Sequence, residues 1–243
     1  MTIYPTDDSQ RKAAKVAGLA YLLSFATLLF GFFGMQSPLI VKGDVAVTIQ
    51  NILAHERQLR AGLICELTYA VGTVVLLTAL YTVLRPVNRS LALLAAFSRL
   101  VYCLMWALIT LNMFAVVRLT TGAVYVGAFQ PQGLQAMVKL FLVLGTDCYY
   151  IGLAFWGLAA AVCSFLWLKS RYIPRLLAAW GALASVWSVF CSAAFLFSPN
   201  FAKTVDPDWF DIPMALFEVT TSVWLLLMGL RPSRAGGTAG TGV

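Results

Sequence analysis

The 243-residue chain is 60% hydrophobic and only 11% charged, with a mean hydropathy of +0.83. A soluble domain averages about 25% charged residues, and a soluble fold of this length cannot bury so much apolar surface while its exterior stays wettable. The composition excludes a soluble enzyme, a disordered chain, a coiled coil and a disulfide-stapled secreted module, and it predicts a protein whose main solvent is lipid.

The charged residues indicate topology rather than nucleic-acid binding. The chain has 17 Lys and Arg against 10 Asp and Glu, and the basic residues stand mostly beside apolar runs, where they orient membrane helices. We therefore expect membrane lipids as partners and no nucleic acid. The five cysteines include no C-x-x-C pair, and the single histidine is His55. The sequence therefore predicts no disulfide, no metal and no cofactor.

Six apolar runs approach the ~20 residues that a helix needs to cross the hydrocarbon core. The fold class we predict is all-α, a polytopic membrane protein with a six-transmembrane-helix bundle at residues 15–230. A cytoplasmic segment (1–14) without a cleaved leader is expected before it, and a disordered cytoplasmic tail (231–243) after it. The predicted spans are residues 15–35, 61–84, 91–117, 137–168, 175–198 and 213–230.

The connections between these runs carry helix-boundary signals. Residues 43–60 place apolar side chains near helical spacing opposite polar ones, a pattern typical of an amphipathic helix in the outer membrane interface. Pro86 and Pro174 stand where one helix ends or the next begins, because proline lacks the amide donor that a helix interior needs. Asp211, two residues before Pro213, is predicted to cap the last span.

Lys and Arg are divided unequally between the two sides of the predicted bundle. Ten stand on the side of the termini and six on the other, so both termini are expected in the cytoplasm. The ten are Arg11, Lys12, Lys15, Arg85, Arg89, Lys169, Arg171, Arg175, Arg231 and Arg234, and the six are Lys42, Arg57, Arg60, Arg118, Lys139 and Lys203.

One stretch of the chain is similar to a known family. Residues 84–100, including Pro86-Val87-Asn88-Arg89-Ser90 and ending near Arg99, resemble an uncharacterised bacterial integral-membrane family that carries a domain-of-unknown-function label. Residues 11–14, 51–54 and 150–158 fit the same family, so the resemblance covers about residues 11–230. It implies a multi-pass protein of the bacterial inner (plasma) membrane, and it carries over no catalytic residue.

Four ionisable side chains lie inside the predicted spans: Glu66, Arg99, Asp147 and Glu218. Each costs about 2.5–3.5 kcal/mol at a helix centre on insertion scales, so each is expected to face protein or water. Counting about 1.5 Å per residue places the three carboxylates in the outer half of the membrane and Arg99 near the midplane. This arrangement predicts one shared site that opens toward the outer face.

Helical spacing predicts which side chains share a face with these charges. Aromatic and polar residues recur three, four or seven positions away, and they give an acidic and aromatic lining that suits a cationic or hydrophobic ligand. The expected ligand-binding residues are Arg99, Tyr69, Tyr102, Trp106, Tyr150 and Asn112.

Three functions agree with this pattern. The first is a membrane protein that binds or acts on a lipid or isoprenoid-like small molecule, as an isomerase or cyclase would, with Asp147 as proton donor and Glu66 or Glu218 as the second acid or base. The second is a structural or assembly subunit in which Arg99 and one carboxylate form an ion pair that fixes helix packing. The third is a small proton-coupled transporter.

Overall fold

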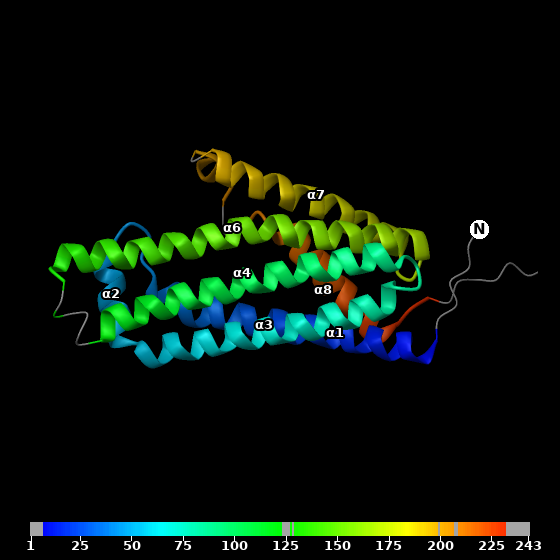
Figure 1. Ribbon diagram of the computed structural model, residues 1–243, viewed down its shortest axis with the longest axis horizontal. Helices are drawn as coiled ribbons and strands as arrows, with labels where there is room; N and C mark the ends of the chain where they lie inside the picture. The colour runs from blue at the N-terminus through cyan, green and yellow to red at the C-terminus, as the bar shows by residue number, and fades with distance from the viewer. Residues whose placement is uncertain (1–6, 123–126, 128, 199, 207–208, 232–243) are drawn as a thin grey trace, which may run out of the picture.

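The structure is a computed structural model that describes residues 7–122, 127, 129–198, 200–206 and 209–231. The predicted tail therefore lies almost wholly outside the described residues. The described part contains helices and no strand, which confirms the all-α class. The elements in chain order are α1 (Asp8–Leu29), the π-helix η1 (Phe30–Gln36), the 3-10 helix η2 (Ser37–Leu39), α2 (Val45–Ala54), α3 (Glu56–Leu84), α4 (Arg89–Thr121), α6 (Pro131–Ser170), α7 (Arg175–Phe197), the 3-10 helix η3 (Phe201–Lys203) and α8 (Ile212–Leu227) (Figure 1).

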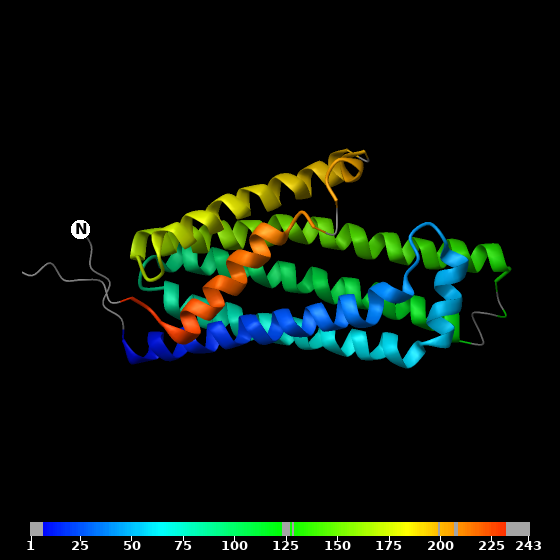
Figure 2. The same cartoon turned by 180° about the vertical axis from the view of Figure 1, so that it is seen from behind.

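Five helical segments of the described chain are long and apolar enough to cross a membrane: Asp8–Leu39, α3, α4, α6 and α7. They correspond to the first five predicted runs. The sixth run forms α8, an apolar helix of 16 residues, which is about 24 Å long and shorter than the ~30 Å hydrocarbon core. In Figure 2, α8 crosses the bundle obliquely.

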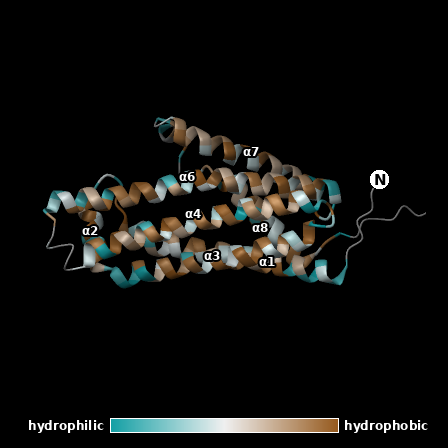
Figure 3. Ribbon diagram, in the orientation of Figure 1, coloured by the Kyte–Doolittle hydropathy of each residue, from teal (hydrophilic) through white to brown (hydrophobic). Residues whose placement is uncertain are grey.

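The long helices lie lengthwise beside one another. The pairs α1–α3, α3–α4, α4–α6, α6–α7 and α1–α8 make the most extensive contacts, and the first and last described residues lie at the same end of the molecule (Figure 1). Figure 3 shows that hydrophilic residues gather toward the helix ends while the middle is mainly hydrophobic. This distribution is the one expected when the middle of a bundle lies in lipid.

The predicted helix over residues 43–60 is interrupted. Asp44 caps α2 by accepting a hydrogen bond from the amide of Val47, but the helix ends at Ala54, and α3 begins at Glu56 after the non-helical backbone of His55. α2 lies across the end of the long helices in both views (Figures 1 and 2). Its Ile52 is buried in a cluster with side chains of α3, α4 and α6, so the apolar face of α2 packs on protein.

The fourth predicted run is a single continuous helix. α6 has 40 residues, which gives a length of about 60 Å, so it is about twice as long as the hydrocarbon core is thick. Pro131 stands in its first turn, where the missing amide donor costs nothing. The helix therefore starts six residues before the predicted boundary at residue 137.

The end of the bundle that holds both termini is tied together around Tyr172, a fully buried residue of the α6–α7 turn. The backbone carbonyl of Tyr172 accepts a hydrogen bond from the amide of Arg231, 3.0 Å away. Gln10 of α1 donates from Nε2 to the carbonyl of Val83, and its Nε2 lies 3.5 Å from the Tyr172 hydroxyl. Four chain segments are thereby linked at one point.

Glycines permit the closest helix contacts. A Cβ atom added to Gly18 of α1 would lie 2.7 Å from the backbone carbonyl oxygen of Ser222 in α8. Small residues at such positions let membrane helices approach and gain van der Waals contact, because lipid supplies no hydrophobic driving force between helices. The short helix α8 is thus seated directly on the backbone of α1.

We predict that Gly18→Ala destabilises the fold by about 1–3 kcal/mol, because the added methyl group meets backbone that must shift. Gly145→Ala is the matched control, since a Cβ there meets only the Asn112 Cβ at 3.9 Å, and alanine favours helix by up to about 1 kcal/mol. Unfolding in mixed detergent micelles measures both values. Equal stability of the two variants would contradict the close α1–α8 contact.

Candidate functional site

A buried ion pair joins α4 and α8 in the middle of the bundle. Arg99 Nη2 lies 2.9 Å from Glu218 Oε1, and the two side chains are 4% and 12% exposed. The sequence predicts that Arg99 pairs with at least one intramembrane carboxylate, and the structure shows that this carboxylate belongs to Glu218.

Two aromatic side chains add hydrogen bonds to this pair. Arg99 Nη2 also donates to the hydroxyl of Tyr21 at 3.0 Å, and the indole Nε1 of Trp156 donates to Glu218 Oε1 at 2.8 Å. Charge-assisted hydrogen bonds of this kind offset the desolvation of a buried ion pair. We call Tyr21, Arg99, Trp156 and Glu218 the ion-pair cluster; its members come from α1, α4, α6 and α8, respectively.

One donor of the ion-pair cluster is unused. Arg99 Nε is buried and has no hydrogen-bond partner among the described residues. A guanidinium group has no acceptor and several N–H donors, and a buried N–H without a partner costs free energy. The cluster therefore offers a hydrogen bond to an acceptor that the described chain does not provide.

Aromatic rings continue from the ion-pair cluster across four helices. Trp156 stacks on Tyr102 with ring centroids 5.5 Å apart, and Trp106 contacts Tyr102, Tyr69 and Tyr149 at 6.4, 5.1 and 6.2 Å. Tyr149 contacts Tyr150, whose ring stacks on Phe195 of α7 at 4.5 Å. We call these rings the aromatic cluster: Tyr69, Tyr102, Trp106, Tyr149, Tyr150, Trp156 and Phe195. It contains all four aromatic residues that the sequence analysis selected.

The structure does not bring the other two selected carboxylates to the ion pair. Asp147 is half-buried on α6, nine residues from Trp156, which is two and a half turns at 3.6 residues per turn. It therefore faces the opposite side of α6 from the residue that contacts Glu218. Glu66 is buried between α3 and α4, where it accepts a hydrogen bond from Thr110 Oγ1 at 2.7 Å.

Asn112 also lies apart from the ion-pair cluster. Its side-chain amide donates to the carbonyl of Leu108, one turn earlier in α4, at 2.8 Å. This local hydrogen bond uses one donor of the amide within its own helix, and it does not link Asn112 to the ion-pair cluster.

The carboxylate of Asp211 does not cap α8, contrary to the prediction. No side-chain hydrogen bond caps that helix, and Asp211 Oδ2 instead accepts from the hydroxyl of Tyr149 at 2.9 Å. The neighbouring backbone is held by indoles of α7: Trp187 donates to the carbonyl of Phe210, and Trp180 to that of Pro213, both at 2.8 Å. The start of α8 is thus fixed by side chains of α6 and α7.

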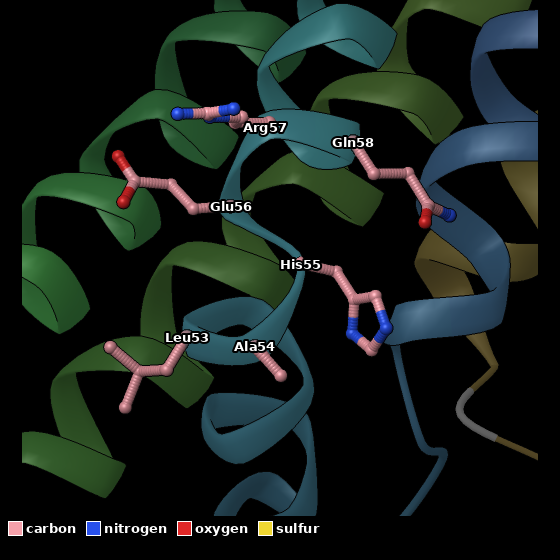
Figure 4. Close-up of a pocket in the computed structure, with 6 residues that line it drawn as sticks. All are labelled: Leu53, Ala54, His55, Glu56, Arg57 and Gln58. Atoms are coloured by element: carbon pink, nitrogen blue, oxygen red, sulfur yellow. The ribbon is translucent and has the colours of Figure 1, made fainter.

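The described chain has a surface pocket at the break between α2 and α3 (Figure 4). It is lined by Leu53, Ala54, His55, Glu56, Arg57 and Gln58, all from one continuous segment. His55 Nδ1 lies 3.2 Å from the carbonyl of Asn51, so this ring nitrogen interacts with the end of α2. None of the residues of the ion-pair cluster lines this pocket.

Sequence reasoning missed two members of the ion-pair cluster. Tyr21 lies 13 residues into α1, and Arg99 lies 10 residues into α4. Both helices start at the same end of the bundle, so a comparison of depths would have placed the tyrosine at a level close to that of the arginine. Trp156 stands inside the segment 150–158 that carries the family resemblance, without an acid near it in the sequence.

The comparison with known families now adds to this geometry. Residues 16–229 match the model of a domain of unknown function, DUF4386. The chain belongs to this family. The match covers most of the chain and confirms the resemblance seen around residues 84–100. No curated protein and no solved structure matches the chain.

We predict that Arg99→Ala lowers the free energy of unfolding by roughly 3–5 kcal/mol, because it leaves the Glu218 carboxylate buried without its partner. Arg60→Ala is the matched control. Its pair with Glu56 is also short, at 2.7 Å, but those side chains are 44% and 37% exposed, so the loss is at most about 1 kcal/mol. Unfolding in mixed detergent micelles compares the two, and a negligible loss for Arg99→Ala would mean that Arg99 reaches water.

Proposed function

We propose that this protein binds an amphiphilic small molecule of lipid or isoprenoid type within the membrane. The polar head accepts a hydrogen bond from Arg99 Nε, and the apolar chain lies against the aromatic cluster. The unpartnered Nε of Arg99 is the observation that carries the proposal, because the described chain leaves this buried donor without an acceptor.

The polar ion-pair cluster and the apolar aromatic cluster lie next to each other. Trp156 belongs both to the ion-pair cluster, through its indole N–H, and to the aromatic cluster, through its stacking on Tyr102. Binding sites for small molecules combine apolar walls with a few polar groups that fix orientation. A hydroxyl, carbonyl or phosphate oxygen in the head group supplies the acceptor that Arg99 lacks.

Acid–base chemistry on such a ligand, an isomerisation or cyclisation, is the catalytic form of this proposal. The geometry favours Glu218 as the participating carboxylate over Asp147, because Glu218 belongs to the ion-pair cluster and Asp147 does not. Aromatic faces of Tyr102 and Trp106 would stabilise positive charge that develops on an apolar substrate.

A structural role is the second candidate. The hydrogen bonds of the ion-pair cluster all link different helices, so the cluster would fix the register of α1, α4, α6 and α8 even without a ligand. The two candidate functions predict different results for a variant that keeps the positive charge at position 99 but lacks the guanidinium Nε. Ligand binding predicts that this variant loses a bound molecule, and the structural role predicts that there is none to lose.

We predict that an amphiphile co-purifies with the wild-type protein in a fixed molar ratio and is lost from Arg99→Lys, because lysine retains the positive charge but lacks the Nε donor. Native mass spectrometry of gently extracted protein, followed by analysis of the released molecules, measures the ratio. Arg60→Lys is the control and keeps the ligand. Ligand-free wild-type protein, or equal retention in both variants, would favour the structural role.

Six membrane crossings, with both termini in the cytoplasm of a bacterial cell, are the topology that we propose. The division of ten basic residues against six supports it, and so does the position of the first and last described residues at one end (Figure 1). α8 would be the short sixth crossing, and α2 would lie at the outer interface.

The topology predicts opposite accessibility of two exposed positions. Ser90 follows the α3–α4 turn, and Thr204 follows η3 in the α7–α8 connection. In a cysteine-free background, Ser90→Cys is expected to react with a membrane-impermeant maleimide only after the inner membrane is opened, and Thr204→Cys in intact spheroplasts. Labelling of both from the same side would contradict six crossings.

A further inference from the structure

A second buried polar group lies away from the ion-pair cluster. Glu66 of α3 is 1% exposed, and its Oε2 accepts the hydrogen bond from Thr110. Thr110 stands 11 residues after Arg99 in α4, which is about 16 Å along the helix. Glu66 is therefore too far along the bundle to share a ligand head group with Arg99.

Glu66 faces a second buried polar side chain, and each of the two has one polar atom without a hydrogen bond of ordinary length. Gln36, at the end of η1, is 1% exposed and interacts with Glu66. Nevertheless neither Glu66 Oε1 nor Gln36 Nε2 makes a hydrogen bond of ordinary length within the described chain, although both atoms are buried. The two side chains thus lie close together in the interior, and each keeps one buried polar atom without a hydrogen bond of ordinary length.

No charged side chain neutralises Glu66 in the described part of the protein. Its described polar neighbours are Thr110 of α4 and Gln36 of η1, and neither ion pair found among the described residues includes it. The neighbouring titratable groups of α3 itself are Cys65 and Tyr69, which are ordinarily neutral at pH 7. An isolated carboxylate in a low-dielectric interior is very costly, so something must neutralise it.

The backbone around Glu66 is arranged to admit Gln36. The π-helix η1, which ends at Gln36, interrupts the regular turns of the first span, and π-helical turns are frequent at functional sites. A Cβ on Gly62 would lie 2.8 Å from Gln36 Cγ. The missing side chain at position 62, one turn before Glu66, therefore leaves room for the glutamine beside the acid.

We propose that Glu66 is a proton-binding site, with Gln36 as the partner of the proton. Uptake of one proton from water forms an O–H bond at Oε1 and leaves the site neutral. The amide of Gln36 has a donor and an acceptor at nearly equivalent positions. Its carbonyl oxygen accepts from the acid when Glu66 is protonated, and its NH₂ group donates to the carboxylate when the proton leaves.

A proton fits this site better than a metal ion. A hard cation needs about six oxygen ligands, whereas the contacts of Glu66 comprise one threonine hydroxyl, which already donates its hydrogen, and one amide. No group of three or more metal-ligating acids, cysteines or histidines occurs in the part of the chain that the structure describes. The site is independent of the proposed amphiphile site, so each can fail without the other.

Infrared spectroscopy of the wild-type protein at neutral pH tests the proposal without a substitution. The chain has three glutamates: Glu56 and Glu218 are paired with arginines, which leaves Glu66 as the glutamate to carry a proton. We expect the C=O band of a protonated carboxylic acid, shifted to lower frequency when the protein is made with carbon-13 glutamate. Absence of a shifted band would overturn the proposal.

Two variants identify the residue and its partner. The band is expected to disappear in Glu66→Gln and to remain in Asp147→Asn, the matched control with a half-buried acid. In Gln36→Leu it should move to higher frequency, because the carboxyl group loses a hydrogen bond. A band that survives Glu66→Gln contradicts the assignment. The free energy of unfolding is also compared in sodium chloride and in choline chloride. If sodium stabilises the wild type but not Glu66→Gln, the site binds a metal ion instead of a proton, and the proposal is wrong.

Discussion

The cost of charge in a low-dielectric interior governs this structure. Arg99 cannot face lipid, so helices from distant parts of the sequence must converge on it: α8 brings the carboxylate of Glu218, α1 brings the Tyr21 hydroxyl, and α6 brings the Trp156 indole. The convergence also explains why a helix as short as α8 packs closely against α1. Gly18 has no side chain, so the backbone of α8 can approach α1 at this position. Packing and electrostatics therefore impose the same arrangement.

The two buried acids of the described core illustrate different solutions to this cost. Glu218 has a cationic partner, because the Arg99 guanidinium group and the Trp156 indole N–H both donate to its Oε1. Glu66 has one threonine hydroxyl and an amide beside it, without a cation. The same side chain thus serves as a fixed anion in one place and as a candidate exchangeable group in the other, and only the neighbours differ.

Hydropathy was sufficient to locate the long helices. In lipid, a spanning segment must satisfy its backbone hydrogen bonds within its own helix, so each span is a continuous apolar run that hydropathy detects. A charge inside a predicted span selected Arg99, and helical spacing from it selected the aromatic residues Tyr102 and Trp106. What failed was the direction of side chains: depth favoured Asp147 over Glu218 as the proton donor, whereas Asp147 faces the opposite side of α6 from Trp156, which contacts Glu218. The break at His55 and the π-helix before Gln36 have no hydropathy signal.

The long separation in sequence between Arg99 and Glu218 has a consequence for biogenesis. The two residues are 119 positions apart, and a ribosome adds about 5–20 residues per second. For roughly 6–24 seconds at that rate the guanidinium has entered the insertion machinery while its counter-ion does not yet exist. Until α8 emerges, water, the translocon or a membrane chaperone must shelter Arg99 of α4, so the release of α4 into lipid has to wait for α8.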